Sequence, residues 1–294
     1  MRLLITGGTG LIGRALLDEL AGEHEVFVLA RRPAAGPPGV RWILQDLSRP
    51  LQTEAWPSRT DCVVHLAQAS GGPGSAGDSE DTFAVGVAST FGLLRYALRA
   101  GARKFILASS GGVQALRVPG TERRGAVTTQ PAIQFYLRAK ACAEILAGDF
   151  ARAMDVVVLR PYFVYGPGQA PPRLIPRLLA RVRGGETITT DCRGGPGLNP
   201  IFVTDAARAF AQAVRTHTPG LTIVDVAGSE VVSLEQVARI LGTLVGVQPV
   251  IAPEPQRPPE ELIGDTRALR EVLGVIPAVG IKEGLERMLA PAGG

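Results

Sequence analysis

Short apolar runs alternate with segments of helical periodicity over the first part of the chain. Runs of about five apolar residues, typical of buried strands, lie at residues 2–6, 25–29, 40–44, 62–66, 104–108 and 155–159. Apolar positions three and four apart, typical of helices, lie at 15–20, 84–100 and 136–150. The alternation predicts an α/β fold with a doubly wound, Rossmann-type parallel sheet.

The pattern becomes less regular after residue 165. Helices are expected at 172–183, 205–215, from 233, at 265–273 and at 281–289, with a short strand at 186–191, an extended segment at 199–204 and a buried strand at 221–226. Asp205 and the Asp265-Thr266 pair are expected to cap helices, and Ser233 with Gln236 has capping-box spacing. A proline-dense loop is expected at 249–259. We therefore expect a nucleotide-binding domain over 1–165, with returning segments at about 199–228, and a smaller substrate-binding lobe over 166–294.

Composition and charge narrow the class of protein. The chain has 294 residues, 46% hydrophobic and 20% charged, with a net charge of +4 and scattered arginines. Small anionic ligands fit this better than nucleic acid. The three cysteines and three histidines have no metal or serine-triad spacing and indicate reduced core cysteines. With no membrane-length apolar run, and a first strand starting at Arg2, we expect a cytoplasmic protein without a signal peptide.

A glycine-rich turn joins the first strand to the first helix. Gly7, Gly10 and Gly13 lie in the sequence GGTGLIG. At a strand–helix junction such glycines allow a tight turn, close approach of a pyrophosphate and packing of helix on strand. The helix N-terminus would then face the phosphates.

The ends of the second and third strands concern the choice of cofactor. Ala30 stands where NAD-binding proteins present an acidic residue to the ribose, and Arg31 and Arg32 follow. Guanidinium groups suit a 2′-phosphate, so NADP is predicted over NAD, although a solvated basic loop would also contain such residues. Asp46 could accept a hydrogen bond from the adenine amino group or cap a turn.

Candidate catalytic residues lie in the middle of the chain. Tyr136 and Lys140 are four residues apart on a predicted helix and therefore share a face. A nearby ammonium group should lower the pKa of the phenol and make it a proton donor or acceptor for an alcohol or carbonyl oxygen. Ser110 follows the fifth strand and could hydrogen-bond the same oxygen. Loops at 70–77 and 114–132 are expected beside the site.

These motifs together resemble the extended short-chain dehydrogenases/reductases called the NAD-dependent epimerase/dehydratase family. The resemblance rests on eight stretches: TGGTGLIG from Thr6, HLA from His65, SS before Val113, YxxxK at Tyr136, LRPYFVYGPG from Leu159, and the later stretches VTD, VAGSEVVSLEQVA and DTRALREVLGVIP. It implies that Ser110, Tyr136 and Lys140 are catalytic. It also implies a cofactor site formed by Gly7, Gly10, Leu11, Ile12, Gly13, Arg31, Arg32, Asp46, Leu47, Leu66, Ala67, Gln68, Tyr136, Lys140 and Pro161. A homodimer through the helices at 84–100 and 136–150 is a further implication.

Three departures from the family pattern bear on the reaction. Sugar dehydratases carry an acidic residue after the catalytic Ser or Thr, whereas Gly111 and Gly112 follow Ser110. Phe163 replaces an asparagine that often contacts the substrate phosphate. The arginine that often grips the pyrophosphate is replaced near Leu198-Asn199.

The resemblance implies hydride transfer at a secondary alcohol or ketone carbon of a nucleotide sugar. A 4-ketoreductase is favoured over an epimerase, because the acid is missing and the basic pair favours NADP. The alternatives are a reductase or dehydrogenase acting on a non-sugar ketone or alcohol, which Phe163 motivates, and a non-catalytic NADP-binding sensor. The intact Ser110, Tyr136 and Lys140 set favours an enzyme over a sensor.

Overall fold

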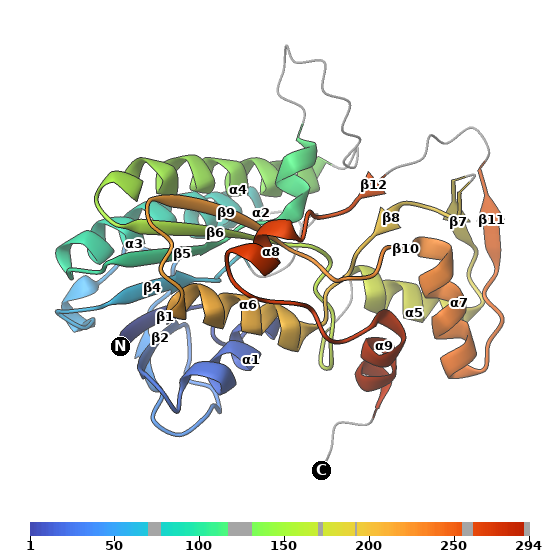
Figure 1. Cartoon of the computed structure of the whole chain (residues 1–294), viewed down its shortest axis with the longest axis horizontal. Helices are drawn as coiled ribbons and strands as arrows, with labels where there is room; N and C mark the ends of the chain where they lie inside the picture. The colour runs from blue at the N-terminus through green and yellow to red at the C-terminus, as the bar shows by residue number, and fades with distance from the viewer. Residues whose placement is uncertain (70–77, 117–130, 170–172, 192, 255–260, 291–294) are drawn as a thin grey trace.

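A seven-stranded parallel sheet forms the centre of the molecule (Figure 1). The structure is a computed structural model and describes residues 1–69, 78–116, 131–169, 173–191, 193–254 and 261–290. The strand order is β3-β2-β1-β4-β5-β6-β9, and every neighbouring pair is parallel. The strands are β1 (Arg2–Thr6), β2 (Glu25–Ala30), β3 (Arg41–Leu44), β4 (Cys62–His65), β5 (Lys104–Ala108), β6 (Asp155–Pro161) and β9 (Leu221–Val226).

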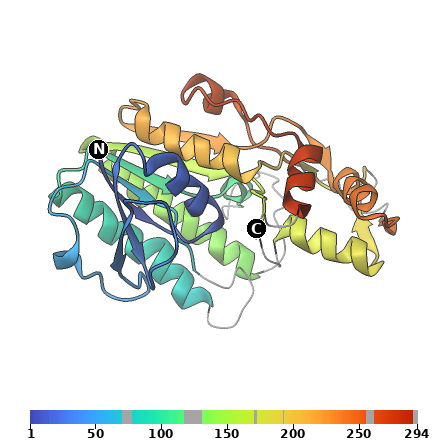
Figure 2. The ribbon, with the colours of Figure 1, turned by 90° about the horizontal axis from the view of Figure 1, so that it is seen from below.

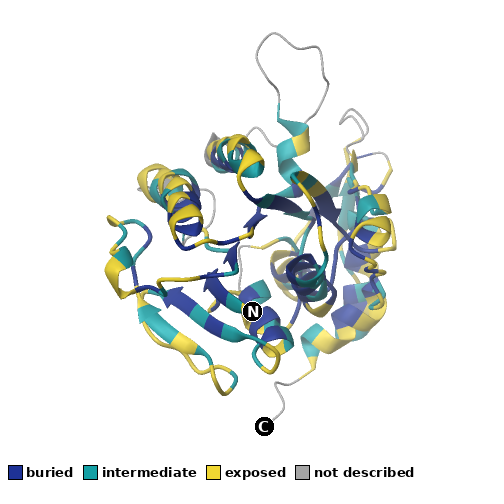
Figure 3. Cartoon of the chain, turned by 60° about the vertical axis from the view of Figure 1, so that its left-hand side comes forward, coloured by how far each residue is buried: buried dark blue, intermediate teal, exposed yellow. Residues whose placement is uncertain are grey.

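Helices cover both faces of the sheet, because alternate side chains of each buried strand point to opposite faces. In β1, Leu3 and Ile5 belong to one apolar core and Leu4 to the other. The first core is completed by α1 (Leu11–Leu20) and α6 (Val203–Arg215), with α8 (Arg267–Glu271) beside them. The second lies under α3 (Ser89–Arg99) and α4 (Pro131–Asp149), with α2 (Asp78–Phe83) and a π-helical turn, Ala84–Ala88, leading into α3. Figure 3 shows the strands mostly buried and the helices exposed on their outer sides.

A smaller lobe lies beside the carboxyl ends of the strands (Figures 1 and 2). Its helices are α5 (Leu174–Gly184), α7 (Leu234–Val245) and α9 (Ile281–Leu289). Its short strands form two small sheets, ordered β10-β8-β12 and β11-β7. They are β7 (Ile188–Thr190), β8 (Gly197–Leu198), β10 (Val232–Ser233), β11 (Ile251–Pro253) and β12 (Glu261–Leu262). The lobe has an apolar core of its own, in which Tyr165 and Phe202 meet edge to face at 5.5 Å between ring centroids.

The strand predictions for the first part of the chain are confirmed to within two residues at each end, and the capping box of Ser233 and Gln236 is present. The prediction that Asp205 caps a helix is wrong, because Asp205 does not cap α6. It is the third residue of that helix, fully buried, and its Oδ2 accepts hydrogen bonds from the backbone nitrogens of Ala278 and Val279. Its charge is therefore used to hold the segment before α9.

Three further expectations need correction. Cys142 is exposed on α4 rather than in the core, whereas Cys62 is buried as expected. The strand β9 is buried only in its second half, because it lies at the sheet edge. The proline-dense loop contains β11, which pairs with β7. Most of the two loops expected beside the site, and Cys192, lie outside the described residues.

Candidate active site

The glycine turn between β1 and α1 packs closely against the end of β4. Gly7 has a φ of +73°, and a Cβ atom there would lie 2.7 Å from the nitrogen of Ala67. A Cβ on Gly13 would lie 2.1 Å from the carbonyl oxygen of Gly7. Both positions therefore require glycine, and they bring the backbone of the turn close to the switch point between β1 and β4.

Helix α1 presents its N-terminus to a large cavity. Gly10 is the N-cap residue, no side chain caps the helix, and its first turn holds no acidic residue. Leu11 and Ile12 line the cavity. Because the first N–H groups of a helix have no partner within it, they favour a phosphate group. The turn and the helix end thus fit the diphosphate of a dinucleotide.

The cavity has a volume of about 1480 Å³. It extends from this turn past Tyr136 to the smaller lobe, which contributes some of its lining residues. It brings together almost every residue that the sequence predicts for the site. Those lining it are Gly7, Gly10, Leu11, Ile12, Gly13, Arg31, Asp46, Leu47, Leu66, Ala67, Gln68, Ser110, Tyr136, Lys140 and Pro161. Arg32 is exposed and is not among the lining residues.

Arg31 and Asp46 mark one end of the cavity. The Oδ1 atom of Asp46 accepts hydrogen bonds of 2.9 Å from both the backbone nitrogen and the hydroxyl of Ser48. These bonds are the main reason why the pKa of Asp46 is lowered, and Arg31 contributes a smaller share. Asp46 therefore caps a turn, one of the two alternatives for it, while also lining the cavity.

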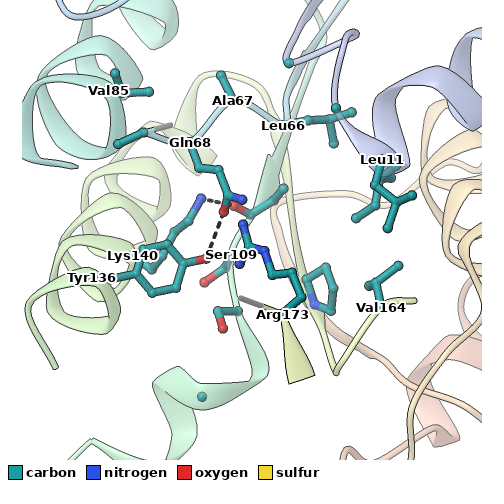
Figure 4. Close-up of a pocket in the computed structure, with 18 of the residues that line it drawn as sticks. Leu11, Leu66, Ala67, Gln68, Val85, Ser109, Tyr136, Lys140, Val164 and Arg173 are labelled. Atoms are coloured by element: carbon teal, nitrogen blue, oxygen red, sulfur yellow. Dashed lines mark hydrogen bonds between the residues drawn. The ribbon is translucent and has the colours of Figure 1, made fainter. Parts of the chain in front are cut away.

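Tyr136 and Lys140 lie on α4, one turn apart (Figure 4). The hydroxyl of Tyr136 donates to Oε1 of Gln68 over 3.2 Å. The ammonium group of Lys140 is buried and donates to the carbonyl oxygen of Ala108, at the end of β5, over 2.7 Å. It lies 5.9 Å from the centroid of the Tyr136 ring.

The expected effect of Lys140 on Tyr136 is not found in this structure. Burial raises the pKa of Tyr136, and the groups that oppose the rise are Arg173 and the Ser110 hydroxyl. Burial also lowers the pKa of Lys140 to about 8, with Glu144 partly opposing the change. The reason is geometric, because the ammonium group turns toward Ala108 instead of the phenol.

An ion pair below the site connects α4 to the ends of β5 and β6. Arg160 donates to both carboxylate oxygens of Glu144, at 2.9 and 2.6 Å, and the hydroxyl of Ser109 donates to the same carboxylate. Both charged side chains are largely buried. Because Ser110 follows Ser109 and Lys140 precedes Glu144 by one turn, this pair fixes the two elements that carry the candidate catalytic residues.

His65 is buried and links two neighbouring strands of the sheet. It is 1% exposed, and its Nδ1 lies 2.7 Å from the hydroxyl oxygen of Thr6. That hydroxyl also accepts from the backbone nitrogen of Ala67. Burial, with a smaller contribution from Lys140, lowers the pKa of His65 to about 3. The ring is therefore neutral at physiological pH and connects β1 to β4.

Two residues near the substrate end of the cavity have unusual surroundings. Phe163 has a φ of +45°. No other non-glycine residue among those described has a positive φ. A Cβ on Gly111 would lie 2.4 Å from the ring of Tyr162, whose hydroxyl donates to the buried carboxylate of Asp225 over 3.3 Å. Position 111 therefore has no room for a side chain.

Nothing in the sequence singles out Arg173 or the Glu144–Arg160 pair. Arg173 directly follows a proline-rich segment, and Glu144 lies within an ordinary helical pattern. The position of Arg160 directly before Pro161, at the end of a buried strand, is the one signal that could have drawn attention to the pair. Among the described residues there is no His, Cys, Asp and Glu cluster suited to a metal ion, and no helix long and apolar enough to cross a bilayer.

A doubly wound sheet with a glycine turn at its switch point, and a tyrosine–lysine pair across the cavity, defines a dinucleotide-dependent enzyme of the short-chain dehydrogenase type. Residues 3–227 match the family model described as the NAD dependent epimerase/dehydratase family. The chain belongs to this family.

Curated relatives and solved structures extend this comparison. The dTDP-glucose 4,6-dehydratase of Streptomyces niveus is 26% identical over 97% of this chain and 90% of its own length. The 2-alkyl-3-oxoalkanoate reductase of Stenotrophomonas maltophilia (strain K279a) is 29% identical over 75% of this chain and 67% of its own. The structure of MoeE5 in complex with UDP-glucuronic acid and NAD is 26% identical, with a TM-score of 0.79 over 98% of this chain and 97% of MoeE5.

Proposed function

We propose that this protein is an NAD(P)-dependent oxidoreductase acting at a secondary alcohol or ketone carbon of a nucleotide sugar, as a 4-ketoreductase rather than an epimerase. The observation that carries the proposal is the single cavity that joins the glycine turn to Ser110, Tyr136 and Lys140. The family and the UDP-sugar bound by MoeE5 support the substrate class.

The residues of the chain have separate roles in the proposed reaction. A bound nicotinamide dinucleotide supplies the hydride, and the N-terminus of α1 would hold its diphosphate. Tyr136 transfers the proton at the substrate oxygen, and Ser110 donates a hydrogen bond to that oxygen. Lys140, held by Ala108, carries a positive charge on the Tyr136 side of the cavity.

The surroundings of Gly111 argue against sugar dehydration as the main reaction. That reaction needs an acidic side chain directly after the catalytic Ser or Thr, as the family resemblance implies. Here the ring of Tyr162 occupies the space that such a side chain would need. Hydride transfer without elimination of water is therefore favoured.

The choice between reductase and epimerase depends on whether the cofactor is exchanged. A reductase releases its dinucleotide in every turnover, whereas an epimerase retains it. We infer NADP as the cofactor from Arg31, which lines the cavity, and from the absence of an acidic residue at Ala30. The NAD bound to MoeE5 makes NAD the other candidate.

The test combines two measurements on the purified protein. Mass spectrometry identifies any dinucleotide that is retained, and NADPH oxidation is followed with 4-keto nucleotide sugars. Dissociation constants for NADP and NAD are measured in parallel, with tighter NADP binding expected. Retained NAD with interconversion of sugar epimers would replace the reductase assignment by an epimerase.

Replacing the candidate proton donor tests the catalytic assignment. Tyr136→Phe should lower the turnover number by about 10²–10⁴-fold or more, because the proton donor is lost. The dissociation constant for the dinucleotide should stay nearly unchanged, because the glycine turn is intact. Unchanged turnover in this variant would refute the role of Tyr136.

A second candidate function is the reduction of a 3-oxo acid. It is supported by the similarity to 2-alkyl-3-oxoalkanoate reductase and by apolar side chains at the substrate end of the cavity, among them Phe163, Leu116 and Leu262. The same catalytic residues would serve both substrates. NADPH oxidation with a 2-alkyl-3-oxoalkanoate, but not with 4-keto sugars, would favour this alternative.

A further inference from the structure

Arg173 brings a guanidinium group to the candidate catalytic tyrosine. It is the N-cap residue of α5, is exposed and lines the cavity. Its side chain points toward Tyr136 and Gln68 (Figure 4). Among the described residues no carboxylate forms an ion pair with it. The positive charge is therefore available to a ligand in the cavity.

The position of this charge limits which part of a substrate it can reach. The reacting oxygen must lie within hydrogen-bonding distance of Tyr136 and Ser110. Arg173 is the cation whose charge most affects the Tyr136 hydroxyl. A group bound by its guanidinium must therefore be carried close to the reacting carbon, and a planar guanidinium suits a carboxylate, which it can bind through two hydrogen bonds.

Each of the two proposed substrate classes has members that carry such a group. In UDP-glucuronic acid the carboxylate is attached to C5, the neighbour of C4. In a 3-oxoalkanoate the carboxylate is attached to C2, the neighbour of the ketone carbon. Both chemistries thus place a carboxylate on the carbon next to the reacting one.

We propose that Arg173 binds a carboxylate on the carbon next to the reacting carbon, so that the enzyme selects acidic substrates over their neutral counterparts. This assignment rests on the proposed function, because it presupposes hydride transfer beside Tyr136. Arg173 could instead bind the diphosphate of a nucleotide sugar. In that case it would contribute equally to the binding of acidic and neutral sugars.

Matched pairs of ligands separate these readings. Dissociation constants are measured by calorimetry in the presence of whichever of NADP and NAD binds more tightly, using Tyr136→Phe protein so that no turnover occurs. The first pair is UDP-glucuronic acid and UDP-glucose, and the second is a 2-alkyl-3-oxoalkanoate and its methyl ester. In the pair that binds, the added substitution Arg173→Gln should weaken binding of the acidic member by about 10- to 100-fold. This is the expected contribution of charged hydrogen bonds. Binding of the neutral member should change by less than about twofold.

Two further variants control for non-specific effects. Arg173→Lys keeps the charge but loses the planar group, so it should recover part of the preference. Arg183→Gln removes an exposed arginine of the same helix that does not line the cavity and should leave all four constants unchanged. Circular dichroism and thermal unfolding check that each variant is folded.

Each remaining outcome has a definite meaning. Equal weakening of acidic and neutral members would assign Arg173 to the diphosphate or to a general effect, and would overturn the proposal while leaving the proposed function intact. No change on Arg173→Gln would also overturn it. Failure of both pairs to bind protein that has its dinucleotide bound would overturn the proposed function and this assignment together.

Discussion

At the scale of single residues, Phe163 combines backbone strain with a place in the cavity wall. Its φ of +45° lies in the left-handed region, which costs a residue with a Cβ roughly 1–2 kcal/mol. Asparagine tolerates this region better than other such residues. The asparagine expected at this position from the family resemblance would therefore be less strained.

A pair of substitutions isolates the strain at Phe163. Phe163→Ala and Phe163→Asn both remove the half-buried ring, but only asparagine suits the left-handed conformation. The asparagine variant should be more stable to urea by about 0.5–1 kcal/mol. Equal unfolding free energies for the two variants would show that the backbone is not strained here.

Lys140 should make the stability of the protein depend on pH in the alkaline range. Its folded pKa of about 8 lies below the ordinary value of 10.5. The unfolded chain therefore binds more protons between these values, so stability contributed by this group rises with pH across about 8 to 10.5. The unfolding free energy of the wild type relative to Lys140→Met should rise by about 1–3 kcal/mol between pH 7 and pH 10. A constant difference in urea titrations would contradict the lowered pKa.

At the scale of elements, Lys104 joins β5 to the end of α6. Its buried ammonium group donates to the carbonyl oxygen of Ala213 over 2.8 Å and to that of Thr216. Lys104→Met would leave these carbonyl groups unsatisfied and should lower the unfolding free energy by about 1–3 kcal/mol. The exposed Lys282 on α9 provides the control, since Lys282→Met should change stability by less than about 0.5 kcal/mol. Equal effects of the two substitutions would contradict the role of Lys104 in joining β5 to the end of α6.

The sequence predicts the elements of the sheet well, because fully buried strands leave a clear apolar signal. It predicts the role of Asp205 poorly, because the hydrogen bonds that its Oδ2 accepts are long-range, and it gives no sign of Arg173. The acidic residue before a helical pattern resembles a cap, yet the partners of Asp205 lie more than seventy residues away at Ala278 and Val279. The residues of the cavity are predicted from motifs, whereas the direction of the Lys140 side chain depends on the Ala108 carbonyl.

At the scale of the whole molecule, the helices on the α3–α4 face of the sheet carry exposed apolar side chains. Those on α2, α3 and α4 are Phe83, Phe91, Leu98, Phe135 and Ile145. The largest exposed fraction is that of Ile145, at 68%. Exposed apolar side chains on this face suit the homodimer predicted from the sequence, in which the two helical segments would form a four-helix interface.

Charge introduced on the α3–α4 face tests the dimer. Ile145→Asp should convert a dimer into a monomer at micromolar protein, measured by sedimentation, because it would bury an unpaired carboxylate. Ile276→Asp is the matched control, since Ile276 is 66% exposed but lies after α8 rather than on the α3–α4 face. A monomeric wild type, or dissociation by both substitutions, would contradict this interface.

The contact between Gly111 and Tyr162 also limits how this chain could acquire a new reaction. An engineer who wished to install water elimination could not simply exchange Gly111 for aspartate, because the new carboxylate would collide with an aromatic ring anchored by Asp225. The ring would have to be shortened first, which would remove one hydrogen bond to Asp225 and leave those from Gln114 and from the backbone nitrogen of Asp265. Water elimination at this position would therefore require at least two coupled substitutions, so packing limits the reactions open to this chain as well as its catalytic residues do.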